Sequence, residues 1–368
     1  MKRTSIHIGR LAGIDVALHY SWFLIFALLA WSLSKSYFPV KYSGLSGLSY
    51  WVMGIIASVL LFCSVLLHEM SHSLTARHFK IEVHSITLFF FGGIAQVKEQ
   101  KFTARKEFWI AIAGPLFSLS LALMFFLITM ANGCIFLKAI TNYLFKLNLI
   151  LALFNMVPAY PLDGGRVFRA ILWKKYKSLG KATYIAAEAG KTFALLMIFF
   201  GVFGMFMGGY GLWYILLGLF LYTISKASYK QTMIKVVLEK YQVKDFVTKR
   251  FKKLNYNLNV MKFNVKDMAR FNQETFPVFK GKNLLGVVRA EHLLKAKKLK
   301  RSIFVENLTI PISRIKIVKY DMNCYKALEL MLRQNMDALP VLDKKGKLVG
   351  MLKSVTLAEV IKAESSLA

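Results

Sequence analysis

The sequence predicts a mainly α-helical, polytopic membrane protein with about six transmembrane helices, followed by a soluble α/β domain. Three observations support this fold class. Hydrophobic residues make up 56% of the 368 residues and charged residues 19%, whereas soluble domains average about 45–50% apolar and about 25% charged residues. The mean hydropathy is +0.47. Beyond about residue 240, long apolar runs give way to short alternating helix and strand patterns.

Six apolar stretches approach the length that a helix needs to cross a bilayer, about 20 residues. We expect spans at residues 18–38, 51–76, 108–131, 140–157, 184–207 and 210–225, within a membrane domain at 1–239. No small-residue cleavage site precedes the first stretch, which favours a retained span over a cleaved signal. Between the second and third spans, IEVHSITLFFFGGIAQVKEQ is rich in β-branched and aromatic residues and predicts one or two strands.

Charge gives the expected orientation and partner. Lysine and arginine total 50 against 19 acidic residues, a formal net charge of +31. Basic residues gather before the first and third spans and after the second, fourth and sixth, while the opposite loops hold only Lys35, Lys41 and Lys138. This asymmetry predicts cytoplasmic termini in a plasma membrane protein. The sequence shows no helix-turn-helix, zinc-finger or RNA-binding pattern, so we expect no nucleic-acid partner and attribute the charge to the lipid bilayer.

The C-terminal domain, residues 240–368, contains a weak internal repeat. FPVFKGKNLLGVVRAEHLL (276–294) parallels LPVLDKKGKLVGMLKSVTLAEVI (339–361). Each segment predicts a strand, a turn with lysine and glycine, a second strand and a helix. Self-similarity at a fixed spacing indicates two packed copies of one unit, at about 241–301 and 302–364.

The second span contains HEMSH, which places His68, Glu69 and His72 in an H-E-x-x-H motif. On a helix, positions i and i+4 share one face, so the two imidazoles can bind one zinc ion beside a glutamate general base. His68 precedes Arg77 by nine residues, which places the site about 14 Å inside the cytoplasmic boundary. The alternatives are a chance match or core histidines whose hydrogen bonds are satisfied within the protein. Core histidines explain this trio poorly, because polar groups within hydrocarbon are costly unless a partner, water or a metal satisfies them.

A catalytic zinc ion usually has three protein ligands, and Asp163 is the first acidic candidate in another span. It lies in FNMVPAYPLDGGRVFRA, where Pro158 and Pro161 should break the helix. Irregular backbone at membrane depth is tolerated where protein covers it or where it lines a wet cavity. Asp163 is therefore well placed as the third ligand. The alternative is a helix N-cap before GGRVF.

HEMSH and NMVPAYPLDGG together resemble the site-2 protease family of intramembrane zinc metalloproteases, over roughly residues 10–225. The resemblance implies that His68, His72 and Asp163 bind one Zn²⁺ and that Glu69 is the general base. Asn155 matches an asparagine that contacts substrate or steadies the oxyanion; its alternative role is a hydrogen bond between helices. FFFGGIA resembles a segment that docks extended substrate. Its glycines, Gly92 and Gly93, either allow close approach of a substrate backbone or simply form a turn, and we favour the turn.

The C-terminal repeat resembles a pair of CBS motifs, which commonly bind adenosine nucleotides such as ATP and often dimerise. The resemblance therefore implies a regulatory domain and a homodimer through it. Nucleotide-binding copies tend to have Ser or Thr after the second strand and Asp three residues later. Here these places hold Arg289 and His292 in the first copy, and Lys353 and Thr356 in the second. ATP is therefore a hypothesis, and these residues could equally be solvated surface.

The family resemblance implies a zinc endopeptidase that cuts the transmembrane segment of a membrane protein near the cytoplasmic side. The expected substrate is a membrane-tethered transcription regulator, such as an anti-sigma factor or a sigma-factor precursor, with further regulatory membrane partners. A transporter or channel regulated by CBS motifs is the alternative, although it leaves HEMSH unexplained. A second alternative is an inactive homologue that binds membrane partners, against which the intact Glu69 argues.

Overall fold

The computed structural model describes residues 5–89, 92–97, 103–131, 133–209, 211–299, 302–343 and 346–366. The chain forms two compact units, Met1–Tyr229 and Lys230–Ala368. The division falls inside helix α8 (Leu212–Leu238), before the boundary expected at residue 239. The end of α8 belongs to the second unit because Leu238 is buried in the core of that unit.

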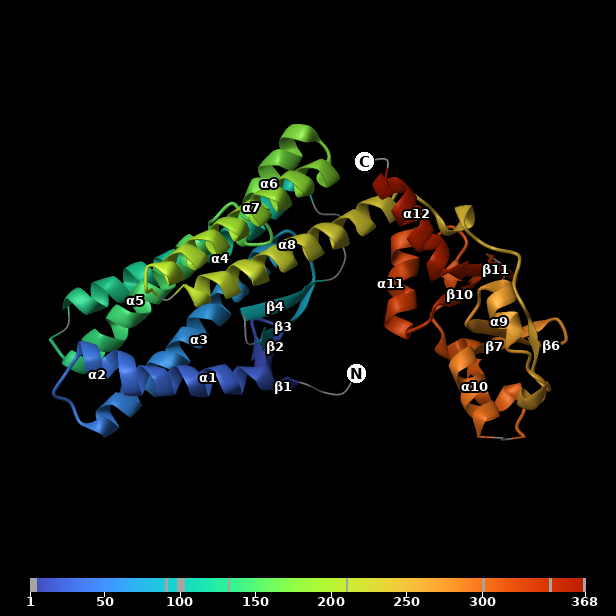
Figure 1. Ribbon diagram of the computed structural model, residues 1–368, viewed down its shortest axis with the longest axis horizontal. Coiled ribbons are helices and arrows are strands. Elements are labelled where there is room, and N and C mark those ends of the chain that lie inside the picture. The colour runs from blue at the N-terminus through green and yellow to red at the C-terminus, as the bar shows by residue number, and fades with distance from the viewer. Residues whose placement is uncertain are drawn as a thin grey trace. The chain divides into compact units, whose positions relative to one another are not determined.

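Helices dominate the first unit, and Figure 1 shows them lying alongside one another with a small sheet beside α3. Before α8, they are α1 (Tyr20–Ser32), α2 (Phe38–Lys41), α3 (Gly47–His78), α4 (Ala104–Ala131), α5 (Ile135–Asn155), α6 (Asp163–Tyr176) and α7 (Leu179–Phe206). A π-helical segment, Leu33–Tyr37, joins α1 to α2. Large apolar side chains such as Phe199 and Leu153 are exposed, which suits a surface that faces lipid.

Five helical segments of the described chain are long and apolar enough to cross a membrane, compared with about six expected. They are Tyr20–Lys41, Gly47–His78, Ala104–Ala131, Ile135–Asn155 and Leu179–Phe206. The sixth expected span, 210–225, falls on α8 from residue 212 onward, and residue 210 lies outside the described residues. The apolar part of α8 ends where Lys226 and Lys230 begin to recur. It is therefore shorter than the roughly 17–25 residues of a span.

One sheet of the first unit has the strand order β1–β2–β3–β4. Its strands are β1 (Ser5–Leu11), β2 (Ile14–His19), β3 (Val83–Phe89) and β4 (Gly92–Val97). Strands β3 and β4 confirm the strand prediction, whereas β1 and β2 were not anticipated and include the first residues of the expected first span. Strand β3 pairs with β2 in parallel and with β4 antiparallel. Among the described residues only β3 pairs with β4, whose outer edge is unpaired.

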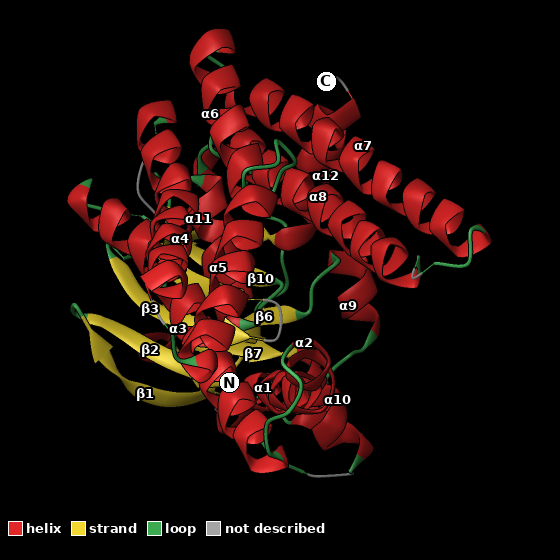
Figure 2. Cartoon of the chain, turned by 90° about the vertical axis from the view of Figure 1, so that its left-hand side faces the viewer, coloured by secondary structure: helices red, strands yellow, loops and turns green. Residues whose placement is uncertain are grey.

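The sheet packs against the C-terminal half of α3, beside which Figure 2 shows β1, β2 and β3. Ile14 and Leu18 of β2 and Ile86 of β3 share a buried cluster with Met70 and Ala76 of α3. Alternating buried positions along β2 explain its conformation, because only one face of that strand meets the core. The cluster therefore fixes the sheet beside the part of α3 that carries HEMSH.

The second unit contains two copies of one topology. The first copy holds β5 (Leu254–Asn255), α9 (Lys266–Phe271), β6 (Thr275–Lys280), β7 (Asn283–Arg289) and α10 (Ala290–Lys298). The short β8 (Ile310–Pro311) pairs with β7 although it lies beyond the boundary expected at residue 301. The second holds β9 (Val318–Lys319), α11 (Cys324–Gln334), β10 (Ala338–Leu342), β11 (Leu348–Lys353) and α12 (Ser354–Ser366). In each copy a short strand runs parallel to the first strand of an antiparallel hairpin.

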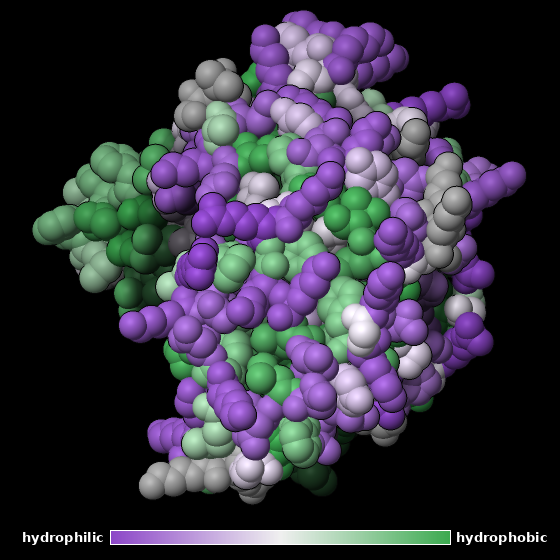
Figure 3. Space-filling view, turned by 90° about the vertical axis from the view of Figure 1, so that its right-hand side faces the viewer, coloured by the Kyte–Doolittle hydropathy of each residue, from purple (hydrophilic) through white to green (hydrophobic). Residues whose placement is uncertain are grey.

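The hairpins of the two copies have equivalent registers. Val278 pairs with Gly286 in the first copy and Val341 with Gly350 in the second. A Cβ at Gly350 would lie 2.6 Å from the carbonyl oxygen of Thr248, so the glycine allows a neighbouring segment to approach. Figure 3 shows hydrophilic side chains projecting over much of one face of this unit, with hydrophobic residues between them.

Candidate metal centre

Helix α3 brings two histidines of HEMSH together on its buried side. The Nε2 atoms of His68 and His72 lie 3.2 Å apart, and their rings meet edge to face. Both residues are buried. The spacing of four residues places them on one face of the helix, as the sequence predicts.

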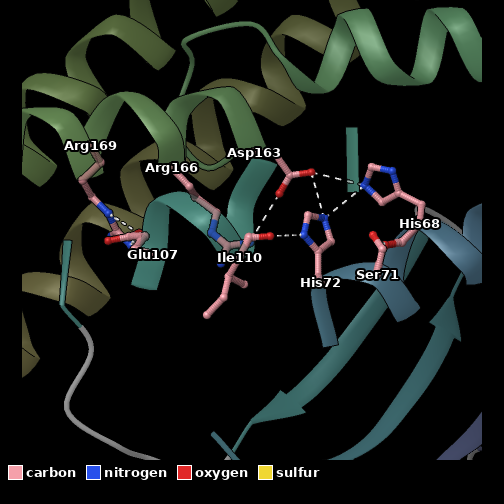
Figure 4. Close-up of polar contacts among 8 residues, drawn as sticks. All are labelled: His68, Ser71, His72, Glu107, Ile110, Asp163, Arg166 and Arg169. Atoms are coloured by element: carbon pink, nitrogen blue, oxygen red, sulfur yellow. Dashed lines mark hydrogen bonds and ion pairs between the residues drawn. The ribbon is translucent and has the colours of Figure 1, made fainter. Parts of the chain in front are cut away.

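Asp163 joins the two histidines from α6, although it lies more than ninety residues away in sequence. Its Oδ2 is 3.2 Å from His68 Nε2 and 3.1 Å from His72 Nε2, as Figure 4 shows. Asp163 is the first residue of α6, and Leu162 occupies the N-cap position without a side-chain cap. The structure thus favours the convergence of Asp163 with the histidines over the N-cap alternative.

Helix α4 orients both imidazole rings through their other nitrogen. His72 Nδ1 donates to the carbonyl oxygen of Ile110 at 2.6 Å, and His68 Nδ1 is 2.9 Å from the hydroxyl of Ser118. A neutral His72 that donates through Nδ1 keeps a lone pair on Nε2. This lone pair faces the oxygen of Asp163, so the two groups present acceptors to each other.

These three residues fit a zinc ion. Their ligand atoms all lie within 4.8 Å of one another, and all three residues are buried. Donors about 2.0–2.2 Å from a tetrahedral ion lie about 3.3–3.5 Å apart, close to the distances found here. Two imidazoles and one carboxylate form a ligand set typical of catalytic zinc. A cation bound to His72 Nε2 and Asp163 Oδ2 would also relieve the repulsion between these facing lone pairs.

Gly114 keeps α4 close to this cluster. A Cβ at that position would lie 2.6 Å from His68 Nε2, so a side chain there would fill the space in front of the imidazoles. The glycine belongs to the AGP segment at 113–115. It allows the helix that orients both histidines to pass directly beside their ligand atoms.

Glu69 lies next to the cluster and faces the sheet. The backbone of Gly93 in β4 forms a hydrogen bond with its carboxyl group. A Cβ at Gly93 would lie 2.5 Å from Glu69 Cγ, so glycine is required for this approach. Gly92 pairs with Phe89 of β3. Both glycines are therefore strand residues, Gly92 as the first residue of β4, next to residues 90–91, which lie outside the described residues.

Asn155 is the last residue of α5 and is half-buried. Its side chain forms no hydrogen bond with another described residue, so the interhelical bond considered as its alternative role is not observed there. Asn148 on the same helix makes that kind of bond instead, donating to the hydroxyl of Ser64 on α3 at 3.3 Å. Sequence analysis did not single out Asn148.

Arg166 and a nearby ion pair also escaped the sequence analysis. Arg166 donates to Oδ1 of Asp163 at 3.3 Å, which leaves Oδ2 for the histidines. About one turn further along α6, Arg169 pairs with Glu107 of α4, and both appear in Figure 4. A glutamate near the start of an apolar span was the available signal, since such charges usually have a partner.

Comparison with known proteins identifies the family. The family model of peptidase family M50 matches residues 56–142 and 135–199, which include the whole cluster. The chain is also 32% identical to sll0528 of Synechocystis sp., which is named as a zinc metalloprotease, over 98% of this chain and 97% of that protein. The chain belongs to peptidase family M50. It is thus a zinc metalloprotease and a membrane protein, which decides against the transporter or channel alternative.

Two further known proteins are similar to this chain. The chain is 30% identical to zinc metalloprotease MJ0392 of Methanocaldococcus jannaschii, over 77% of this chain and 78% of that protein. A solved site-2 protease from Methanocaldococcus jannaschii is 31% identical and covers 61% of this chain and 94% of that chain, with a TM-score of 0.41. The family model of the CBS domain matches residues 305–363, so this M50 protease carries a CBS domain.

Basic residues of the second unit reach across between its two copies. Arg289, at the end of β7, lies 3.2 Å from His292 and donates to the carbonyl oxygen of Asn335 beyond α11 at 3.5 Å. Lys353, at the end of β11, donates to the carbonyl oxygen of Phe271 in α9. Helix C-termini favour such cations. A phosphate at either place would compete with these carbonyls, and ATP binding stays a prediction.

Proposed function

We propose that this M50 protease cuts within a transmembrane segment of a membrane-tethered regulatory protein, near the cytoplasmic side. The observation that carries the proposal is the convergence of His68, His72 and Asp163 beside Glu69. His68 and His72 lie within α3, a candidate span, and these two histidines and Asp163 are buried. The short distance along α3 from His68 to Arg77 favours the cytoplasmic half of the bilayer.

The three clustered residues would hold one zinc ion, which polarises the scissile carbonyl and acidifies the attacking water when bound. Glu69 accepts the proton of that water on its carboxylate and delivers it to the leaving amide nitrogen. Gly93 holds this carboxylate in place through its backbone. Arg166 orients Asp163 through Oδ1. Asn155, free of other described partners, would donate its amide to the substrate carbonyl as negative charge develops there.

Strand β4 is the proposed docking edge for substrate. A helical peptide bond is shielded by its own hydrogen bonds, so the substrate must unwind before cleavage. An unwound segment exposes backbone groups that an unpaired strand edge can satisfy. FFFGGIA, the segment that resembles a substrate-docking segment, includes the start of β4. Because β3 is paired on both sides, the available edge is that of β4. Gly93 in β4 places it directly beside Glu69.

A Gly93→Ala variant should cut substrate at least about tenfold more slowly and keep its full zinc content. The added methyl group would lie 2.5 Å from Glu69 Cγ and displace the general base without touching the proposed ligands. Gly9→Ala is the matched control, because Gly9 lies in β1 of the same sheet with no atom near the added methyl. Equal cleavage rates for both variants would contradict the proposed place of β4.

Regulation through the second unit is also part of the proposal. Helix α8 carries Ser225, whose hydroxyl donates to the carbonyl oxygen of Tyr160 in the loop before Asp163. The same helix ends at Leu238 in the core of the second unit. A continuous helix can transmit a change at one end to the other. A homodimer through the CBS copies and further membrane partners stay predictions of the family resemblance.

The proposal is tested by co-reconstituting the full-length protein in liposomes with synthetic single-span polypeptides. The polypeptides differ only in the depth of an Asn-Pro pair that unwinds the span, and mass spectrometry identifies the fragments. Wild type should cut spans that unwind in the cytoplasmic third, and should leave a fully helical span intact. Cleavage confined to the opposite side, or none by zinc-loaded enzyme, would contradict the proposal.

A further inference from the structure

A buried charged cluster lies beside the proposed metal centre and has no part in the mechanism so far. Arg169 of α6 donates through Nε to Oε1 of Glu107 at 2.9 Å, and a second guanidinium nitrogen contacts the same oxygen. Its remaining nitrogen donates to the hydroxyl of Tyr160 at 2.9 Å. The side chains of Arg169 and Glu107 are 13% and 3% exposed. Burying two charges is costly, so the network calls for an explanation.

Tyr160 connects this cluster to the loop that leads into Asp163. The guanidinium group of Arg169 lies over its ring, 4.5 Å from the centroid. The backbone N–H of Tyr160 donates to the carbonyl oxygen of Ala186 on α7 at 3.3 Å, and the carbonyl oxygen of Tyr160 accepts from the hydroxyl of Ser225 on α8. Three helices thus hold one residue, Tyr160, by its ring, its hydroxyl and its backbone.

The first turn of α6 packs against Tyr160 without room for a side chain. A Cβ at Gly165 would overlap the backbone of Tyr160, and one at Gly164 would overlap that of Met156. Any shift of Tyr160 therefore moves the turn that begins with Asp163. A ligand carboxylate needs placement within a fraction of an ångström, since its oxygen must reach both imidazoles.

We propose that Arg169, held by Glu107, is a positioning residue for the metal centre. It fixes Tyr160 and the first turn of α6, so that Oδ2 of Asp163 stands 3.1–3.2 Å from both imidazoles. Arg169 touches neither the ligand atoms nor Glu69 and acts through Tyr160. The inference rests on the proposed role of Asp163 as a ligand.

A purely structural role for the ion pair makes a different prediction. Replacing one partner alone strands a buried charge and destabilises the fold, whereas replacing both with apolar residues is often neutral or stabilising. A Glu107→Leu/Arg169→Met double variant therefore separates the two roles. If the pair only joins α4 to α6, restoring the fold should restore zinc binding. If Arg169 positions Tyr160, zinc binding should stay weak in a well-folded protein.

The experiment measures the zinc dissociation constant by chelator competition on the full-length protein in detergent, together with the thermal unfolding midpoint. We expect the double variant to unfold near the wild-type temperature and to bind zinc about 10- to 100-fold more weakly. Tyr160→Phe keeps the ion pair and loses only the hydroxyl, so it tests the proposal even if the double variant misfolds. It should weaken zinc binding about tenfold.

Two further variants make the outcome decisive. Glu188→Gln removes an ion pair with Lys191 on α7, a control that should leave zinc affinity unchanged. Asp163→Ala removes the proposed ligand and shows how strongly zinc affinity depends on it. If Asp163→Ala loses zinc while Tyr160→Phe and the double variant bind it as wild type does, only the positioning role is overturned. If Asp163→Ala retains wild-type affinity, the ligand assignment and the positioning role both fail.

Discussion

A Glu69→Gln variant should show no detectable cleavage while retaining about one zinc ion per chain. The amide has nearly the same shape as the carboxylate but cannot accept the proton of the attacking water, and a general base contributes about 10²–10⁴-fold to rate. Because Glu69 contacts Gly93 and is not one of the clustered donor atoms, metal content should not change. Zinc analysis and the liposome assay on one preparation check both halves of this expectation.

Glu82→Gln is the matched control for this substitution. Glu82 is exposed in the segment between α3 and β3, outside the cluster. The Glu82→Gln variant should cleave substrate at the wild-type rate. An active Glu69→Gln enzyme would refute the assigned base. A wild-type enzyme as inactive as Glu69→Gln, with zinc bound, would support the inactive-homologue alternative.

His72→Ala should lose both zinc and cleavage, because it removes one of three converging donors. Its neighbour Asp163 would then keep one imidazole partner, too few for a stable catalytic site. The measurements are zinc per chain and product formation at saturating substrate. His78→Ala on the same helix is the matched control, since His78 is exposed at the end of α3 and should behave as wild type. Full zinc in His72→Ala would show that the ligands lie elsewhere.

The core of the candidate site could be predicted because its parts obey local rules. Helical geometry alone places His68 and His72 on one face, four residues apart. The prolines before Asp163 mark an interrupted helix, and a charged residue at such a break in a membrane protein needs a partner. Metal chemistry then requires a third ligand, so two distant motifs could be joined without any knowledge of the fold.

The supporting contacts could not be predicted, because they depend on how helices pack. Nothing in the spacing of Glu107 and Arg169 along the chain indicates that α4 and α6 bring them together. Nor does FFFGGIA reveal that Gly93 lies in a strand against Glu69, since Gly-Gly is equally typical of a turn. In the structure the two glycines begin β4, where their backbone pairs with Leu88 and Phe89 of β3.

At the two ends of the membrane domain, the expected spans and the observed elements differ in their bounds for identifiable reasons. The apolar residues of β2 alternate, but they run directly into α1 and so merge with the expected first span. Helix α8 differs at its other end, because its apolar half continues beyond the expected span into a lysine-bearing half of the same helix. A hydropathy pattern alone does not show where a continuous helix leaves the bilayer.

Zinc content tests the central claim most directly, because it needs no substrate. The full-length wild type and its Asp163→Ala variant are purified in detergent, and zinc per chain is measured by mass spectrometry. We predict about one zinc ion in wild type and a large loss in the variant, with both proteins folded. A well-folded wild type without zinc, or an Asp163→Ala variant with the full complement, would contradict the proposed three-ligand centre.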